Sequence, residues 1–357
     1  MTGRGIDQVL PEPLSPELYE SWVRDAREYV RLAEKVNGAI PAPVAMDYIW
    51  GDALAEMDRL AADARIVNLE TAVTRAATPC PGKGIHYRMN PAHVGCLAAA
   101  QIDACSLANN HVLDWGVEGL AETLATLHAA GVVTAGAGAD LQQASAPVVL
   151  SLGDSARLLL FAFATTTSGV PPEWAAHAQR SGVALLPQLD EDAAQGLAET
   201  VRVQRRAGDV VVVSLHWGEN WVDEIPAPQR WFAHRLIDLG AADVVHGHSS
   251  HHPLPIEVHA GKLVLYGCGD LINDYEGITP RGRLRSDLGC LYGATVDRAD
   301  GRLRRLDIVP LQLRRFRLTH PQPAVRQWLQ RLLDHGCQAL GTGLERSADG
   351  HWQLRWR

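Results

Sequence analysis

The sequence lacks any apolar run of the roughly 18–20 residues that a membrane-spanning helix needs. Residues 1–7 contain no apolar core of the kind that a secretory signal peptide carries. The six cysteines are scattered and form no Cys-x-x-Cys pair, which argues against a disulfide framework and against a structural zinc ribbon. We therefore expect a cytoplasmic protein without a membrane span.

Positive charge is also in short supply. The 33 lysines and arginines are outnumbered by 41 acidic residues, and the net charge of −8 argues against a nucleic-acid binder that depends on phosphate contacts. The one basic stretch, residues 302–317, alternates with apolar residues and predicts strands with a solvated basic face. With 46% hydrophobic and 21% charged residues, the composition is that of a globular protein.

The pattern of apolar residues predicts an α/β protein that forms one domain over residues 1–357. Residues 1–46 are expected to be a helical excursion, residues 47–285 a core that carries the motifs, and residues 286–357 strands and a helix. In the core, helical stretches alternate with short β-branched runs, which is typical of largely parallel, buried strands.

The individual elements follow from the same pattern. The expected strands of the core are 65–70, 102–108, 132–136, 158–164, 209–216, 242–246 and 262–266. The expected helices are 18–36, 54–64, 91–100 and 117–130. Near the end, runs at 288–296 and 303–313 are expected to pair antiparallel through the turn sequence at 297–301.

Histidine is abundant, with fifteen in the chain and five between residues 246 and 259. Carboxylate, amide and imidazole side chains follow the ends of the predicted strands: Glu70, Asn110, His111, His216, His246, His248 and His251. Because the carboxyl ends of parallel strands meet at one edge of a sheet, we expect these side chains to converge. Each has a structural explanation when taken alone, such as a turn-forming asparagine or a hydrogen-bonded buried histidine.

Together, this set of side chains suits a divalent ion such as Mn²⁺, Fe²⁺ or Zn²⁺. It lacks the thiolates of a structural zinc site, and it offers more nitrogen donors than calcium or magnesium prefers. The sequence therefore predicts a metal centre at the sheet edge.

At this point the sequence resembles a known family. The motifs that carry the resemblance are residues 66–71, 107–114, 215–219, 233–238, 247–251 and 256–267. They resemble the CapA-like proteins of poly-γ-glutamate and capsule biosynthesis, a branch of the calcineurin-like metallophosphatase superfamily. The resemblance implies a four-layer αββα sandwich that holds two divalent metal ions at the sheet edge and no organic cofactor.

The resemblance also implies roles for individual residues. Glu70 is implied to bind or bridge the metals, and Asn110 to be a ligand. The implied imidazole ligands are His216, His248 and His251, with His246 in reserve. His111 is the implied acid/base group beside the metals.

The beginning of the chain departs from the family pattern. Such proteins usually start with an apolar strand that ends in Gly-Asp, whose aspartate is a metal ligand, whereas residues 1–7 resemble the segment just after that strand. Three explanations stay open: the start of the chain is assigned too late, Asp47 or Asp52 substitutes for the missing ligand, or one of the two metal sites is weak.

The family leaves the reaction open. CapA-like proteins are associated with γ-linked glutamate polymers, and a related soluble branch includes metal-dependent peptide epimerases of lasso-peptide pathways. Because the chain has no membrane anchor, we expect a peptide substrate whose residue is epimerised at Cα during natural-product peptide biosynthesis. The alternatives are a component of poly-γ-glutamate or capsule synthesis, a metal-dependent phosphoester hydrolase, and a non-catalytic scaffold.

The epimerisation hypothesis assigns further residues. A metal-bound carbonyl oxygen makes the Cα–H more acidic, and two acid/base groups then remove and return the proton. His111 and His86 are the candidate pair, with Cys268 as a reserve base. The candidates for substrate binding are Lys83 and Arg88, which would clamp a carboxylate, and Trp217 and Trp221, which would form an apolar wall.

Overall fold

The computed structural model describes residues 1–153, 156–278, 284–347 and 350–357. Its largest sheet has seven strands, of which four form a parallel centre in the order β8 (Ala156–Thr165), β11 (Val210–His216), β12 (Val244–His248) and β14 (Lys262–Leu265). The remaining strands are β10 (Leu185–Leu186), which pairs parallel with β8, and β7 (Val148–Leu152) and β13 (Ile256–His259), which pair antiparallel. The parallel strands predicted in this part of the chain are confirmed.

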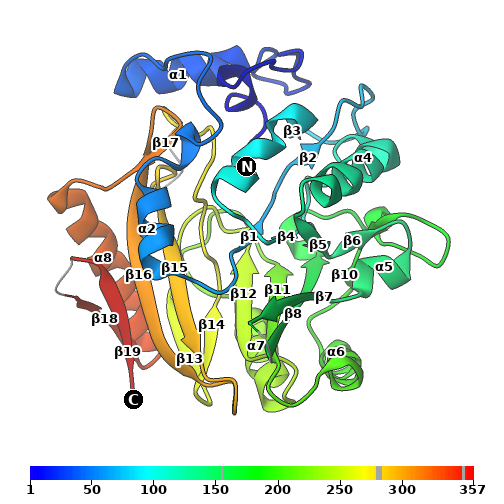
Figure 1. The fold of residues 1–357 in the computed structure, drawn as a ribbon, viewed down its shortest axis with the longest axis vertical. Helices are drawn as coiled ribbons and strands as arrows, with labels where there is room; N and C mark the ends of the chain where they lie inside the picture. The colour runs from blue at the N-terminus through cyan, green and yellow to red at the C-terminus, as the bar shows by residue number, and fades with distance from the viewer. Residues whose placement is uncertain (154–155, 279–283, 348–349) are drawn as a thin grey trace.

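Alternation along β11 explains why this sheet is buried on both faces. Val211 and Val213 pack with Phe232 and other apolar residues of α6 (Glu191–Gln204) and α7 (Ala227–Asp238), which cover the outer face (Figure 1). Val212 points the other way, into the main core. Since side chains alternate between the two faces of a strand, His216 at the end of β11 lies on the inner face with Val212.

A second, three-stranded parallel sheet faces the inner side of the first. Its strands are β1 (Ile66–Asn68), β4 (Ala104–Ser106) and β5 (Val133–Ala135), in that order. They alternate with α2 (Ala53–Leu60), α3 (Gly95–Ala99) and α4 (Gly116–Ala129), as predicted. The smaller elements of this region are α5 (Leu141–Ser145), the ladder of β2 (Ala72–Val73) with β3 (Arg88–Met89), and that of β6 (Ala137–Gly138) with β9 (Gly182–Val183).

The C-terminal part forms an antiparallel five-stranded sheet. Its strands are β15 (Leu288–Val296), β16 (Leu303–Arg314), β17 (Arg317–Thr319), β18 (Thr342–Arg346) and β19 (Trp352–Trp356), and α8 (Pro323–Ala339) packs against β18. The predicted antiparallel pair is confirmed. Arg302, Arg304 and Arg305 are exposed, as expected for a solvated basic face.

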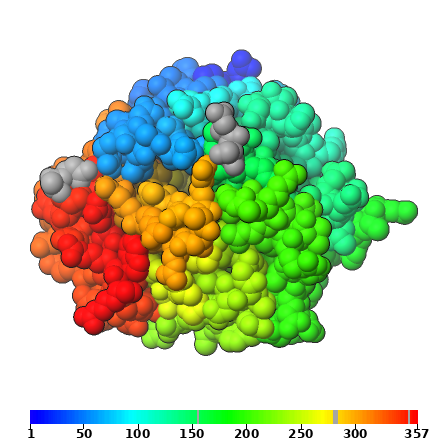
Figure 2. Space-filling view, turned by 60° about the horizontal axis from the view of Figure 1, so that its bottom comes forward, coloured from blue at the N-terminus to red at the C-terminus, as the bar shows by residue number. Residues whose placement is uncertain are grey.

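The N-terminal region differs from the prediction in one respect. The helix α1 spans Arg27–Asn37 and does not begin at residue 18. The preceding loop is closed by backbone bonds from Leu18 N to the Arg24 carbonyl (3.0 Å) and from Ala26 N to the Pro16 carbonyl (2.7 Å), so these amides bond across a loop instead of along a helix. Further along, the N-terminal region lies against the C-terminal sheet (Figure 2), where Asp52 N donates to the Leu318 carbonyl at 3.0 Å.

The mixed sheets and helices confirm the α/β class. Within the described ranges, no helix combines the length and the apolar character that crossing a bilayer requires.

Candidate metal centre

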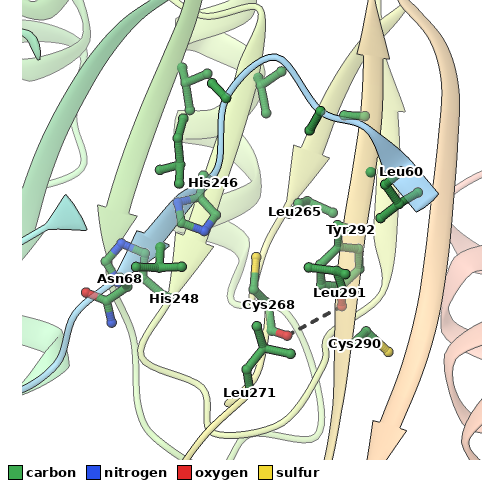
Figure 3. Close-up of a pocket in the computed structure, with 18 of the residues that line it drawn as sticks. Leu60, Asn68, His246, His248, Leu265, Cys268, Leu271, Cys290, Leu291 and Tyr292 are labelled. Carbon is green, nitrogen blue, oxygen red and sulfur yellow. Dashed lines mark hydrogen bonds between the residues drawn. The ribbon is translucent and has the colours of Figure 1, made fainter. Parts of the chain in front are cut away.

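Two neighbouring strands place four polar side chains on one face of the large sheet. In the parallel register of β11 and β12, His216 lies opposite His248, and Ser214 lies opposite His246. All four positions have the same parity along their strands, so their side chains point to the inner face. His246 and His248 are seen on β12 in Figure 3, beside Asn68 at the end of β1.

These side chains contact one another directly. The Nδ1 atoms of His216 and His248 are 2.8 Å apart. The hydroxyl of Ser214 lies 2.8 Å from Nε2 of His248 and 3.0 Å from Nδ1 of His246. Burial lowers the pKa of His246 to about 4 and holds the pKa values of His216 and His248 well below the ordinary range. The three imidazoles are therefore neutral near pH 7, which is the form that binds metal ions.

The loop after β4 brings an amide and an acid/base pair to the same place. The Oδ1 atom of Asn110 is 3.2 Å from Nε2 of His216. The neighbouring His111 directs Nδ1 at the carboxylate of Asp114 over 2.6 Å, and that carboxylate also accepts a hydrogen bond from Tyr87 N (2.6 Å) and one from Lys83. Asp114 thereby fixes the ring of His111 and leaves its Nε2 as the atom that can exchange a proton.

Burial shifts the pKa values of both Asp114 and His111. Burial raises the pKa of Asp114 to about 6, although the ammonium of Lys83 acts in the opposite direction. Burial also holds the pKa of His111 well below its ordinary value, and Lys83 adds to that effect. At neutral pH the pair therefore consists of an ionised Asp114 and a neutral His111.

Glu70 and His251 lie at the other side of the cluster. Glu70 is buried just beyond β1, and burial raises its pKa. Its carboxylate accepts a hydrogen bond from the Asn68 amide (3.0 Å), and the Asn109 amide donates in turn to Asn68 (3.1 Å). This chain of bonds ties Glu70 to the loop that carries Asn110.

His251 is held by a carboxylate of its own. Its Nδ1 lies 3.1 Å from both carboxylate oxygens of Asp270. Burial alone would lower the pKa of His251, but Asp270, together with Glu70, raises it overall. The Asp270 contact fixes the ring through Nδ1, as metal-binding histidines are commonly fixed by a carboxylate.

The donor set fits a divalent ion, although the side chains are hydrogen-bonded to one another. Within the residues that the structure describes, no three His, Cys, Asp or Glu side chains are already arranged around one ion position. His216 and His248, whose Nδ1 atoms are 2.8 Å apart, and Asn110, whose Oδ1 lies 3.2 Å from Nε2 of His216, would hold such an ion through imidazole nitrogen and amide oxygen donors.

The residues proposed for substrate binding have different surroundings. Lys83 donates to Asp114 and to the Asn110 carbonyl, so it supports the acid/base loop. The guanidinium of Arg88 donates to the Ala76 carbonyl (2.8 Å) and stacks on Trp115 at 3.9 Å.

The two tryptophans also differ. Trp217 is fully buried, donates to the Tyr266 carbonyl (2.8 Å) and stacks on that tyrosine, as a core residue does. Trp221 is half-buried and packs on the rings of His251 and His252, at the rim of the cluster.

The remaining two acid/base candidates do not join the imidazole cluster through a hydrogen bond in the described part of the chain. The Nε2 atom of His86 lies 2.8 Å from the Cys80 carbonyl, and its ring packs near Trp115. Cys268 lines a cavity next to the site, and burial strongly raises the pKa of its thiol, so the thiolate that a base requires is disfavoured.

The sequence interpretation assigned no individual role to three residues that build the site. Asp114 lies three positions after His111, Ser214 shares the strand face of His216, and Asp270 follows β14. The even spacing of Ser214 and His216 was a usable signal, whereas the contact of Asp270 with His251 depends on how the loops fold.

A buried arginine, Arg4, contacts a tyrosine that packs against the acid/base loop. Arg4 forms ion pairs with Asp274 (2.5 Å) and Glu20 (2.7 Å), and its guanidinium stacks on Tyr29 and Tyr87 at 3.9 and 4.4 Å. The ring of Tyr87 in turn packs edge-on against His111 at 4.5 Å. The arginine thus links the start of the chain to the acid/base loop.

We expect Arg4→Lys to lower the free energy of unfolding by roughly 1–3 kcal/mol, because lysine keeps the charge but loses the two-pronged contact with Asp274 and the flat stacking. Urea unfolding measures the change. Arg27→Lys is the control, because its ion pair with Asp25 is exposed and its loss should change stability by less than about 1 kcal/mol. Equal effects of the two substitutions would contradict the structural role of Arg4.

The buried imidazoles also predict how stability depends on pH. His246 has a lowered pKa of about 4 in the folded protein, so between about pH 4 and 6.5 the unfolded chain binds more protons than the folded chain. Stability of the metal-free protein should therefore rise with pH across that window, and His246 alone should contribute about 1–2 kcal/mol between pH 5 and 7. Urea unfolding at the two pH values, with a chelator present, measures the difference.

The controls for that experiment are two single substitutions. His246→Asn should reduce the pH dependence, whereas His128→Asn, at an exposed position of α4, should leave it unchanged. A pH dependence that is the same in all three proteins would show that His246 is not held neutral.

Comparisons with known proteins identify the family of the chain. The model of the bacterial capsule synthesis protein PGA_cap family matches residues 1–275. A probable polyglutamine synthesis accessory protein of Mycobacterium tuberculosis is 44% identical over 342 residues, which cover 96% of this chain and 90% of the relative. The PGA biosynthesis protein CapA of Bacillus subtilis is 30% identical over 192 residues, which cover 54% of this chain and 48% of the relative. The capsule biosynthesis protein CapA of Bacillus anthracis is 26% identical over 193 residues.

The family match covers every residue of the candidate metal centre, from Glu70 to Asp270. The chain therefore belongs to the PGA_cap family of bacterial capsule synthesis proteins, as its motifs suggested.

Proposed function

We propose that this protein is a divalent-metal-dependent enzyme that acts on the chain of a glutamate polymer during its synthesis. The observation that carries the proposal is the convergence of His216, His248 and Asn110 beside the His111–Asp114 pair. The names of the relatives, which refer to polyglutamine, PGA and capsule synthesis, favour the polymer over the peptide epimerisation that the sequence suggested.

We also propose a specific arrangement of the layers in the fold. The outer helices α6 and α7, the seven-stranded sheet and the smaller sheets on its inner face support a four-layer αββα sandwich of the metallophosphatase type. The donors lie in two groups, one around His216 and His248 and the other around Glu70 and His251, which supports two ions.

Each part of the site has a task in this proposal. The bound ions would supply Lewis acidity and positive charge, which a chain of net charge −8 needs in order to hold an anionic polymer. His216, His248, His251, Asn110 and Glu70 would hold them. His111 would move a proton at its Nε2, while Asp114 fixes the ring and Lys83 keeps Asp114 in place.

The direct test is to incubate the purified protein with poly-γ-glutamate after loading with Mn²⁺, Fe²⁺ or Zn²⁺. Chain length, incorporation of deuterium at Cα from D₂O, and phosphate release from p-nitrophenyl phosphate are followed in parallel. We expect a metal-dependent change in the polymer that a chelator abolishes. Phosphate release at ordinary enzyme rates without any change in the polymer would refute the proposal in favour of phosphoester hydrolysis.

A further inference from the structure

Three arginines lie on one tight turn of the C-terminal sheet. Arg314 ends β16 and Arg317 begins β17. Arg315 and Phe316 connect the two strands, and we call residues 314–317 the basic turn. The three arginine side chains are exposed, whereas the ring of Phe316 is buried in the main core and anchors the turn. The basic turn thus presents three guanidinium groups to solvent, just below α1 in Figure 1.

These guanidinium groups have no carboxylate partner in the part of the chain that the structure describes. Arg314 donates to the side-chain oxygen of Asn37 at 3.1 Å. The guanidinium of Arg317 lies 6.0 Å from the ring centroid of Tyr48, and the hydrogen bonds of Arg315 are made by its backbone. Arg314 and Arg317 are also directly opposite each other in the ladder, where like charges repel and lower stability. A bound anion would relieve that repulsion.

The arginines at the beginning of β16 have a different environment. Each of Arg302, Arg304 and Arg305 lies 2.6–3.6 Å from an aspartate carboxylate of the same hairpin. We call these three residues the paired arginines. Because the chain has 41 acidic residues against 33 lysines and arginines, carboxylates are not scarce as partners. The lack of a counter-charge is therefore a property of the basic turn and not of β16 as a whole.

The backbone of the basic turn does not favour an arginine at its centre. Arg315 has a φ of +58° and Phe316 one of +55°, and hairpin turns with this left-handed geometry prefer asparagine and glycine. The turn is nevertheless fixed, because the buried carboxylate of Glu276 accepts hydrogen bonds from both amides, at 2.7 and 2.6 Å. Burial of its ring accounts for Phe316, whereas the exposed side chain of Arg315 has no such role. Strained conformations of this kind cluster at functional sites.

Glu276 also connects the basic turn to the candidate metal centre. It lies in the loop after β14, in which Asp270 holds the ring of His251 and Tyr275 packs edge-on against the same ring at 5.4 Å. The carboxylate that fixes the turn thus directly follows a residue that contacts a proposed metal ligand. The turn lies beyond residues 1–275, which the family model matches, so the motifs of the family assign it no role.

The two groups of arginines lie at opposite ends of β16, and only one of these ends is near the metal centre. β16 begins beside the amino end of β14, because Leu303 N donates to the Gly261 carbonyl at 2.8 Å. It ends at the basic turn, beside the loop that follows β14. The basic turn is therefore at the carboxyl end of the parallel strands, where the metal centre lies. The paired arginines are roughly 30 Å away along the extended strand.

We propose that the basic turn binds the anionic glutamate polymer and positions it beside the metal centre. This inference rests on the proposed function, which names the polymer as substrate. Every γ-linked glutamate has a free carboxylate, and guanidinium groups bind carboxylates through two parallel hydrogen bonds. Repeated carboxylates would supply the negative charge that Arg314, Arg315 and Arg317 lack. Because the chain as a whole has a net charge of −8, a local basic surface attracts a polyanion to one place on the molecule.

The test measures binding of fluorescently labelled poly-γ-glutamate by anisotropy, with the full-length protein as purified and after treatment with a chelator. R314Q/R315Q/R317Q removes the charges of the basic turn. R302Q/R304Q/R305Q is the matched control, because it removes the same number of charges from the other end of the strand. At about 20 mM salt, we expect the first variant to bind at least about tenfold more weakly and the control to stay within about twofold of the unsubstituted protein.

Two further measurements test whether charge at the turn is responsible. R314K/R315K/R317K keeps the charges and should bind the polymer at least about fivefold more tightly than the corresponding glutamine variant. The difference between the two glutamine variants should largely disappear at about 0.5 M salt, because salt screens exposed charges. The substituted side chains are exposed, so all variants should fold, and the thermal midpoint of unfolding checks this.

The other outcomes would overturn the proposal. Equal weakening by the two glutamine variants would mean that general charge, and not the turn, attracts the polymer. Tighter binding of double-stranded DNA or of phosphatidylserine vesicles than of the polymer, lost in R314Q/R315Q/R317Q, would assign the turn to a different polyanion. Turnover of the polymer without binding at the turn would contradict this inference alone, whereas binding at the turn without metal-dependent turnover would contradict the proposed function alone.

Discussion

Replacing His216 by alanine should weaken the binding of Mn²⁺ or Zn²⁺ by at least about 100-fold and leave the protein folded. The ring of His216 contacts His248 through Nδ1 and Asn110 through Nε2, so it lies between two other donors. Because burial keeps the pKa of His216 well below its ordinary value, the imidazole is ready to bind a metal at pH 7 without first losing a proton. Isothermal titration of the chelator-treated protein with each metal measures the affinity.

A second histidine provides the matched control. His259 ends β13 on the outer side of the molecule, where its ring stacks on His234 at 3.8 Å and its Nε2 lies 2.8 Å from Asp238. His259→Ala removes an imidazole of the same size and should leave the metal affinity unchanged. If His216→Ala bound metal as tightly as the control variant, the candidate centre would be wrong, provided that circular dichroism shows both proteins folded.

The positions of the imidazoles could be predicted because they follow from the parity of strands. A run of four valines followed by Ser-Leu-His specifies a buried strand, and position 216 must then share a face with position 214. The same rule places His246 and His248 together on β12, and for that reason the sequence could not choose between them. The structure distinguishes the two histidines by their contacts. His248 contacts His216 directly, whereas the hydroxyl of Ser214 lies between His246 and His248.

The supporting contacts could not be predicted because they join residues that are distant in the sequence. Arg4 meets Asp274 across 270 positions, and neither residue lies in a periodic pattern that would reveal the partner. The composition predicts a helix over residues 18–36, but the backbone bonds that close the loop at 16–26 fix a different conformation before Arg27. Local propensity is a weak guide when tertiary contacts decide the outcome.

Replacing His111 by glutamine should reduce turnover of the glutamate polymer by about 10²–10⁴-fold, while metal affinity stays within a few-fold of the unsubstituted protein. The reason for this separation is geometric. His111 directs Nδ1 at Asp114, and not at the imidazole cluster, so its loss removes proton transfer without removing a donor to the ions. Titration with metal and polymer assays on the same preparations measure the two quantities, and a parallel loss of both would instead make His111 a metal-holding residue.

Asp114, whose carboxylate holds the ring of His111, predicts how turnover depends on pH. Because burial raises the pKa of Asp114 to about 6, its carboxylate is protonated below that pH and cannot accept the Nδ1 proton of His111. Turnover should therefore rise as pH increases from about 5 to 7, with Lys83 and the Tyr87 amide holding the ionised carboxylate. Asp114→Asn should lower turnover and flatten that rise. If turnover of Asp114→Asn rose with pH at the same midpoint as turnover of the unsubstituted protein, another group would control the reaction. The metal ligands would then be the next groups whose titration should be tested.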